Sequence, residues 1–197
     1  MIQRKILILG YGHLGAAFSR LYGHYQIRGV RRSRVVPAPP GLIQMPIQSE
    51  ALIPHIEWAD VILFCAAPGR RDLTQYRETY LDNITFLFNL IGKYPTPLDC
   101  FVLISSTGVY PRGMGGIWHE DDPIAIETPL QSILLDTEQA VVASGLPYAI
   151  LRSGGIYGEE RGYLHRVLQE GKIMQSAMSE QWVTSIHQDD LCGIIHE

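Results

Sequence analysis

Short, continuously apolar stretches alternate with amphipathic stretches along most of this chain, and this alternation constrains the fold more than any other feature. Three of the apolar stretches are Lys5–Leu9, the run VILFCAAPG after Asp60, and Cys100–Ile104. A strand that is apolar on both sides has to be covered on both faces, which happens in parallel sheets flanked by helices. The sequence therefore predicts an α/β fold with a doubly wound parallel sheet and helices on both faces.

The spacing of apolar residues also predicts where the elements lie. Strands are expected at Lys5–Leu9, Gln26–Val30, Leu42–Pro46, directly after Asp60, Cys100–Ile104 and Tyr148–Leu151. Helices are expected at His13–Tyr22, Ser49–Glu57, Leu73–Tyr94 and Thr128–Ser144. After Leu151 the pattern is looser, with a helix-like run GEERGYLHRVLQEGK and a strand and turn in WVTSIHQDDL. We therefore divide the chain into a sheet domain at 1–152 and a smaller segment at 153–197 that packs on the same core.

The first predicted strand leads into GYGHLG, in which Gly10, Gly12 and Gly15 have the spacing G-x-G-x-x-G. In dinucleotide-binding proteins these glycines allow a tight turn, a close approach to the pyrophosphate, and packing of the helix on the sheet. The helix start at His13 and Leu14 adds N–H groups and a partial positive charge. The place of this turn between a strand and a helix predicts a dinucleotide site, the alternative being a turn without a ligand.

Three arginines follow the second predicted strand in GVRRSR. About 20 positions after the glycine turn, an acidic residue binds the ribose of NAD, whereas an arginine accommodates the 2′-phosphate of NADP. Arg31 and Arg32 occupy this place, and residues 1–49 contain no Asp or Glu. The sequence therefore favours NADP(H), with NAD(H) as the alternative. Arg34 is as consistent with a solvated loop.

Composition excludes several other classes of protein. No apolar run approaches the roughly 20 residues that cross a bilayer, and the N-terminus lacks the pattern of a secretory signal. Three widely spaced cysteines (Cys65, Cys100 and Cys192) do not form a disulfide framework, and no Cys/His cluster has metal-site spacing. We therefore expect a cytoplasmic protein without a metal or a membrane partner. The seven basic residues within 1–49 form no long run, so nucleic acid is not an expected partner.

Four later motifs follow the glycine turn in a fixed order: ADVILFCAAPG, FVLISSTGVYP, LRSGGIYGEERG and TSIHQDDL. Together they resemble the extended short-chain dehydrogenase/reductases, specifically the NAD(P)-dependent epimerase/dehydratase family, over essentially the whole chain. The resemblance implies a Rossmann-type domain, a nicotinamide cofactor, a small C-terminal substrate lobe and, in many members, a homodimer. Family members continue beyond the turn that corresponds to HQDDL, so we expect the substrate lobe of this chain to be incomplete.

The resemblance also implies roles for individual residues. Ala66 and Ala67, at the end of the fourth strand, would line the cofactor, and Ser105 would lie beside it. Ser106 matches the family's Ser or Thr that hydrogen-bonds the substrate oxygen. Tyr157, in the sequence GIYG, falls in the loop near the nicotinamide.

One departure from the family concerns its catalytic pair, a Tyr followed four residues later by a Lys. The corresponding stretch, AIETPLQSILLDTEQAVVASG, contains no Tyr, Lys or His. Alignment on Glu138 places Leu130 and Leu134 at the two positions, and aliphatic side chains cannot transfer protons. Tyr110 and His119 are the nearby candidates for this role, although His119 is as consistent with a solvated turn.

Two functions follow from these observations. The first is an oxidoreductase or epimerase for a small carbonyl- or hydroxyl-bearing substrate or a nucleotide sugar, with Ser106 orienting its oxygen and a nonstandard group carrying the proton. The second is a non-catalytic NAD(P)-binding redox sensor or regulatory protein, which the missing Tyr–Lys pair favours. The fold alone does not decide between them.

Overall fold

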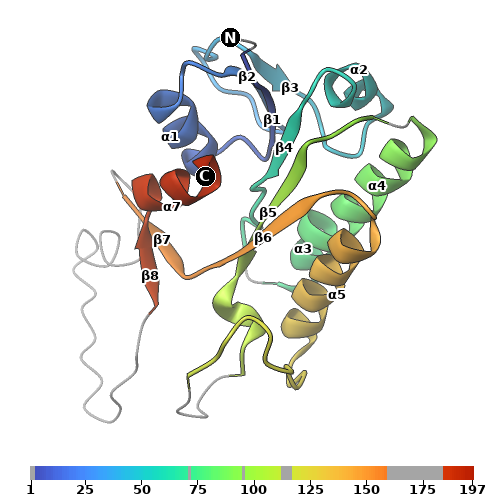
Figure 1. Ribbon diagram of the computed structural model, residues 1–197, viewed down its shortest axis with the longest axis vertical. Helices are drawn as coiled ribbons and strands as arrows, with labels where there is room; N and C mark the ends of the chain where they lie inside the picture. Colours follow the sequence, from blue (N-terminus) through green and yellow to red (C-terminus); the bar gives the residue numbers. More distant parts are fainter. Residues whose placement is uncertain (1–2, 71, 95, 112–116, 159–183) are drawn as a thin grey trace.

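Six parallel strands form the central sheet, in the order β3-β2-β1-β4-β5-β6 (Figure 1). The computed structural model describes residues 3–70, 72–94, 96–111, 117–158 and 184–197. The strands are β1 (Lys5–Leu9), β2 (Gln26–Arg31), β3 (Leu42–Gln44), β4 (Val61–Phe64), β5 (Cys100–Ser106) and β6 (Tyr148–Ser153). The strand order reverses between β1 and β4. Ligands of such sheets bind at this point, outside the carboxyl ends of the strands.

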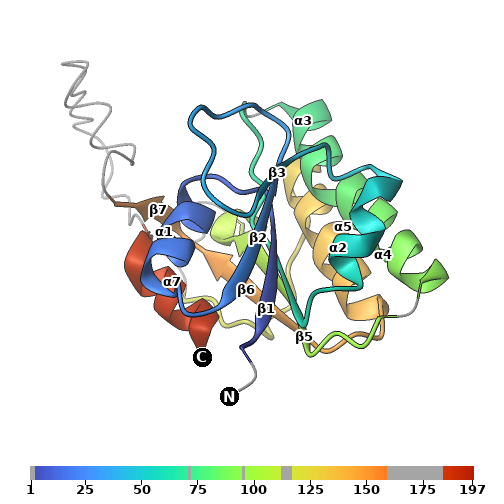
Figure 2. The ribbon, with the colours of Figure 1, turned by 90° about the horizontal axis from the view of Figure 1, so that it is seen from above.

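Helices cover both faces of this sheet, as the continuously apolar strands predict. One face carries α1 (His13–Leu21) and α7 (Gln188–His196), and the other carries α2 (Ile53–Ile56), α4 (Asn83–Lys93) and α5 (Pro129–Ala143) (Figure 1 and Figure 2). The side chains of consecutive β1 residues point alternately to the two faces of the sheet. Leu7 belongs to the core with Leu87 of α4, and Ile8 belongs to the core with Phe18 of α1. All four side chains are at most 1% exposed, so both layers exclude water. The predicted fold class is confirmed.

The expected helix Leu73–Tyr94 is a helical run of three parts. It begins as α3 (Leu73–Arg77), widens into a π-helical turn, η2 (Glu78–Asp82), and continues as α4. The side-chain amide of Asn83 donates to the backbone oxygen of Thr79 at 3.0 Å, across the widened turn. Turns of this kind interrupt α-helices at functional sites more often than elsewhere.

The helix α5 begins and ends at signals that are visible in the sequence. Thr128 accepts a hydrogen bond from the backbone N–H of Gln131, whose side chain accepts one from the backbone of Thr128, forming a capping box. Pro129 occupies the first helical position, and Gly145 follows the helix end with φ +72°. The expected helix at Thr128–Ser144 is therefore confirmed to within one residue at each end.

The C-terminal part of the chain returns to the sheet domain. A short second sheet pairs β7 (Gly155–Tyr157) with β8 (Ser185–His187), and α7 then packs against α1. In the sequence HQDDL, expected as a turn, His187 ends β8 and residues 188–191 form the first turn of α7. His187 caps this helix, and Arg20 of α1 forms an ion pair with Asp189 at 3.1 Å. The helix expected in GEERGYLHRVLQEGK lies outside the described residues.

Across the parts of the chain that the structure describes, no helix combines the length and the apolar character needed to cross a membrane.

Candidate functional site

The turn after β1 approaches the residue pair after β4 so closely that only glycine fits at its first position. Gly10 has a φ of +87°, and a Cβ atom on it would lie 2.3 Å from Cα of Ala66. The N–H groups of Gly10 and Tyr11 donate to the carbonyl oxygen of Val30, at 3.0 and 2.8 Å. The turn is therefore fixed against the ends of both β4 and β2.

The other two glycines of the motif face different surroundings. A Cβ atom on Gly12 would meet only the carbonyl oxygen of Gly10, at 3.8 Å, so a ligand can approach the backbone there. Gly12 is also the N-cap of α1 and has no side chain to satisfy the N–H groups of the first helical turn. A Cβ atom on Gly15 would lie 3.1 Å from Cγ2 of Ile8, so this glycine allows α1 to pack on β1.

A cleft of about 790 Å³ opens at the carboxyl ends of the strands, on both sides of the glycine turn. Its volume lies in the range of small-molecule and cofactor sites. Most of the residues predicted to bind the cofactor line it: Gly10, Gly12, His13, Leu14, Arg31, Arg32, Ala66, Ala67 and Ser105. Ser106, predicted to contact the substrate oxygen, also lines the cleft, whereas Gly15 and Tyr157 do not. The structure thus joins the separate motifs of the sequence in one cavity.

Arg31 and Arg32 form the end of the cleft beyond β2, together with Ser33. The Nε atom of Arg31 is buried and has no hydrogen-bond partner among the described residues. A buried donor without an acceptor costs about 1–3 kcal/mol, and more when it is charged. The only carboxylates that line the cleft within the described residues are Glu78 and Asp82, on η2. An anionic ligand group would therefore satisfy Arg31 where the protein itself does not.

The two serines at the end of β5 have separate environments. Ser106 Oγ accepts a hydrogen bond from the backbone N–H of Gly108 at 3.0 Å and is only partly buried. Ser105 is buried, and its hydroxyl donates to Oε1 of Glu138 in α5 at 2.5 Å. Ser106 is thus the serine whose hydroxyl is available to a ligand, and Ser105 connects the cleft to the interior.

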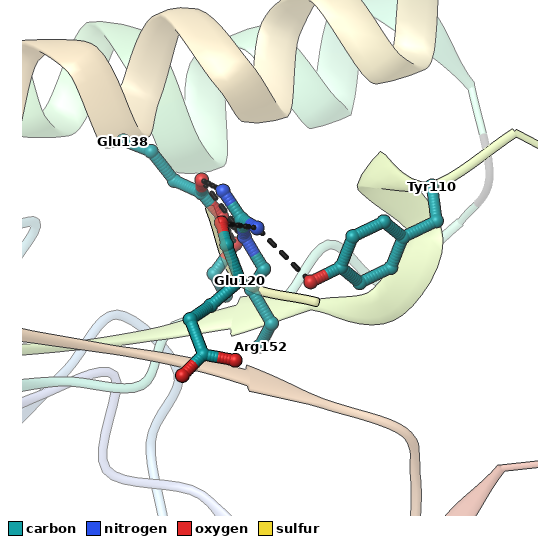
Figure 3. A network of polar contacts seen from close by, with 5 residues as sticks. Tyr110, Glu120, Glu138 and Arg152 are labelled. Atoms are coloured by element: carbon teal, nitrogen blue, oxygen red, sulfur yellow. Dashed lines mark hydrogen bonds and ion pairs between the residues drawn. The ribbon is translucent and has the colours of Figure 1, made fainter. Parts of the chain in front are cut away.

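Behind Ser105 lies a polar network that links α5, β6 and the segment between β5 and α5 (Figure 3). Arg152 donates through Nη2 and Nε to Oε2 of Glu138, at 2.8 and 3.1 Å. Its Nη1 donates to the hydroxyl of Tyr110 and to the carbonyl oxygen of Glu120, both at 3.0 Å. The bond to Glu138 raises the pKa of Arg152 above its ordinary value, so the guanidinium stays charged. The network connects these elements, and Tyr110 lines a second hollow rather than the cleft.

The positions aligned with the family's Tyr–Lys pair hold only aliphatic side chains. Leu134 is 3% exposed, and its Cδ1 atom would lie 3.6 Å from a Cβ atom added to Gly108. Leu130 is half-buried in the first turn of α5. Neither residue can take up or release a proton, so any proton transfer in this cleft needs another group.

His119 and Tyr157 lie apart from the cleft lining. His119 is exposed, and its backbone N–H donates to Oδ2 of Asp122 at 2.7 Å. Tyr157 is 47% exposed, and its ring lies edge-on to His187, with ring centroids 5.2 Å apart. Across the described ranges, no three His, Cys, Asp or Glu side chains are grouped to hold a metal ion.

The part of the cleft lining that comes from η2 was not predicted from the sequence. Glu78, Thr79, Tyr80 and Asp82 of this turn line the cleft, and so does Asn83, the first residue of α4. Asp82 forms an ion pair with Arg77 at 3.4 Å, whereas Glu78 is exposed. Burial raises the pKa of Tyr80 far above its ordinary value. Little in the sequence indicates this turn, because apolar residues on either side of a π-helical turn are spaced almost as they are in an α-helix.

No protein-family model matches the chain, and no curated protein matches it. Solved structures with the same architecture do. A protein of Methylobacillus flagellatus assigned to the NAD-dependent epimerases/dehydratases is 25% identical, with a TM-score of 0.78, over 98% of this chain and 68% of that one. A nucleoside-diphosphate sugar epimerase of Corynebacterium glutamicum is 20% identical, with a TM-score of 0.79, over 98% of this chain and 43% of that one. The human epimerase family protein SDR39U1, solved with NADPH, is 22% identical, with a TM-score of 0.78, over 98% of this chain and 68% of that one.

Proposed function

We propose that the chain is a member of the extended short-chain dehydrogenase/reductases of the NAD(P)-dependent epimerase/dehydratase family, and that it is an NADP(H)-dependent oxidoreductase or epimerase. Its substrate is a small molecule with a carbonyl or hydroxyl group, such as a nucleotide sugar. The observation that carries the proposal is one continuous cleft lined by the glycine turn, by Arg31 and by Ser106.

The residues of the cleft fit such a cofactor part by part. At the glycine turn, the missing Cβ of Gly12 and the N–H groups at His13 and Leu14 suit a pyrophosphate. Arg31 Nε, buried without a partner among the described residues, suits the 2′-phosphate of NADP(H). Ala66 and Ala67 leave space beside the turn. When bound, the nicotinamide ring of this cofactor accepts or donates a hydride.

Ser106 is the residue that we assign to the substrate oxygen. Its hydroxyl lines the cleft at the carboxyl end of β5, and its Oγ already accepts one hydrogen bond, from Gly108. The hydroxyl hydrogen can therefore be donated to a substrate carbonyl or alkoxide oxygen. The nucleotide-sugar class is suggested by the Corynebacterium glutamicum structure, a nucleoside-diphosphate sugar epimerase of which the chain spans 43%.

The proposal is tested by titration and then by turnover. The intrinsic fluorescence of the protein, or that of the bound reduced cofactor, is followed as NADPH and NADH are added separately. We expect NADPH to bind at least tenfold more tightly, because one charge-assisted contact to a phosphate contributes roughly 1.5–3 kcal/mol. Equal binding of the two, or binding of neither, would contradict the proposed cofactor.

Oxidation of NADPH is then followed at 340 nm with a panel of carbonyl compounds, and conversion of nucleotide sugars is followed by chromatography, because an epimerase regenerates its cofactor in each cycle. Turnover that is lost in Ser106→Ala would support the proposed reaction. The second candidate function, a non-catalytic NAD(P)-binding sensor or regulator, is favoured by Leu130 and Leu134 at the positions of the catalytic pair. Firm NADPH binding without turnover on any member of the panel would favour that function instead.

A further inference from the structure

Glu78 is a carboxylate in the half of the cleft where the nicotinamide end of a dinucleotide would lie. The sheet order and the glycine turn after β1 divide the cleft in two, with Arg31 and Arg32 beyond β2 and the serines beyond β5 on the opposite side. The turn η2 packs against α5, the helix that also packs on β5 and β6. Glu78 therefore belongs to the Ser106 half of the cleft, where the chemistry of a dinucleotide enzyme takes place.

Elimination among the titratable side chains that line the cleft leaves Glu78 as the one suited to take up a proton. Arg31 and Arg32 stay protonated at any ordinary pH and so cannot take up a proton. His13 begins α1 at the glycine turn, where the pyrophosphate rather than the substrate would lie. The Tyr80 hydroxyl is held neutral by burial, which raises its pKa. Asp82 is engaged by Arg77.

Two further titratable groups line the cleft near the glycine turn, Tyr11 and Cys65. The ring of Tyr11 is packed against the protein, and the thiol of Cys65 is hydrogen-bonded. The Tyr11 ring packs where Gly29 has no side chain, since a Cβ atom on Gly29 would lie 2.2 Å from ring atom Cδ2. The Cys65 thiol donates to the carbonyl oxygen of Gly10, at 3.4 Å. Glu78 forms no ion pair with a described residue, and it is exposed on η2 at the cleft.

We propose that the Glu78 carboxylate is the catalytic base of this chain, standing in for the absent tyrosine; this rests on the proposed function. As a substrate alcohol is oxidised, its O–H bond breaks and the proton goes to an oxygen of Glu78. The electron pair left on the substrate oxygen forms the C=O bond, and the hydrogen on carbon leaves with its electron pair for the nicotinamide of NADP⁺. In the reverse direction the protonated Glu78 returns the proton to the oxygen.

A carboxylate at Glu78 should also change the relative affinities for the oxidised and reduced cofactor, whatever the substrate is. The oxidised nicotinamide ring carries a positive charge that the reduced ring lacks. A carboxylate at this end of the cleft therefore favours the oxidised cofactor over the reduced one. For two unit charges about 6–8 Å apart at an effective dielectric constant of about 40, Coulomb's law gives a preference of roughly sixfold to tenfold.

The test compares the dissociation constants of NADP⁺ and NADPH, measured by calorimetry, for the wild type and three variants. Glu78→Gln and Glu78→Ala remove the charge in the cleft, and Glu57→Gln removes one exposed charge outside it. We expect the ratio of the two constants to move against NADP⁺ by about threefold to tenfold in both Glu78 variants and to stay unchanged in Glu57→Gln. Circular dichroism verifies that each variant is folded.

An unchanged ratio in both Glu78 variants, with both cofactors still bound, would overturn the role of Glu78 and leave the proposed function in place. Failure of the wild type to bind either cofactor would overturn the proposed function and this inference together. With a substrate from the panel, Glu78→Gln should lower kcat by about 100-fold or more and change KM by less than about threefold. Retention of wild-type kcat in that variant would also overturn the inference.

Discussion

Gly10 is the residue on which the shape of the cleft depends. Its φ of +87° is one that side-chain-bearing residues rarely adopt, and a Cβ atom would collide with the backbone of Ala66 rather than with a movable side chain. The turn and the end of β4 therefore cannot separate locally to admit a larger residue. Conformation and close contact together fix glycine at this position.

Gly10→Ala should lower the free energy of unfolding by about 2–4 kcal/mol, because it adds backbone strain and overpacking at once. Urea denaturation measures this change. Gly92→Ala is the matched control, since Gly92 lies in α4 with nothing within 4 Å of an added Cβ atom, and it should change stability by less than about 1 kcal/mol. Equal effects of the two substitutions would contradict the described turn.

Arg31 is the residue that we propose gives the cleft its preference for NADPH, because its buried Nε has no partner among the described residues. Arg31→Ala should weaken NADPH binding by about 10- to 100-fold and NADH binding by less than about threefold, because only NADPH has the phosphate that the guanidinium would contact. Arg34→Ala, an exposed arginine outside the cleft, should leave both affinities unchanged. Calorimetric titration of both cofactors measures these differences. A loss shared equally by NADPH and NADH would show that Arg31 does not bind the 2′-phosphate.

Among the elements, α5 and β6 are connected by the charged pair Glu138–Arg152. Glu138 is 5% exposed, and charged side chains are this buried only when they are paired. Removal of one partner leaves the other charge without compensation. We therefore expect the pair to matter mainly for the rigidity of the serine end of the cleft, because Ser105 donates to the same carboxylate.

Arg152→Leu should lower the free energy of unfolding by about 2–4 kcal/mol, somewhat less than for a fully buried pair because the Arg152 side chain is 21% exposed. Tyr110→Phe, which removes one hydrogen bond from the same guanidinium, should cost about 0.5–1.5 kcal/mol. Both are measured by urea denaturation at neutral pH. If the two variants were equally stable, the ion pair would not have the role described.

The contact between α1 and α7 should respond to alkaline pH through Cys192. Burial, and to a smaller degree the charge of Asp189, raises the pKa of this thiol to about 11. A raised pKa in the folded state means that the stabilisation is complete below the ordinary thiol pKa near 9 and is lost between pH 9 and 11. The wild type should therefore lose about 1–2 kcal/mol more than Cys192→Ala over this interval. Parallel stability curves for the two proteins would contradict this assignment.

The elements were predictable from the sequence to different degrees. Strands such as β1 and helices such as α5 followed from apolar spacing and capping residues, because those signals are local. The turn η2 did not, since Tyr76, Tyr80 and Ile84 recur every four residues in a pattern that also suits an α-helix. The pairing of Glu138 with Arg152 was also not predictable, because several arginines were available and the sequence does not state which one faces a buried carboxylate.

At the scale of the whole molecule, the strand order brings the candidate site residues together in one cleft. The strand order places the glycine turn at the centre of the sheet, Arg31 on one side of it and Ser106 on the other. The sequence predicted these three features separately, and the shared edge of a parallel sheet brings them together. Missing from that prediction was Glu78, whose position depends on the widened turn. Tyr110 and His119, predicted as catalytic candidates, lie outside the cleft lining.

A crystal structure of the wild-type protein grown with NADPH would decide whether the cleft is a cofactor site. We expect electron density for the cofactor in the cleft, with the pyrophosphate at Gly12 and the start of α1 and the 2′-phosphate within hydrogen-bond distance of Arg31. Its nicotinamide should lie on the side of Ser106 and Glu78. Density at any other site, or a cleft that stays empty at millimolar cofactor, would rule out the proposed cofactor site.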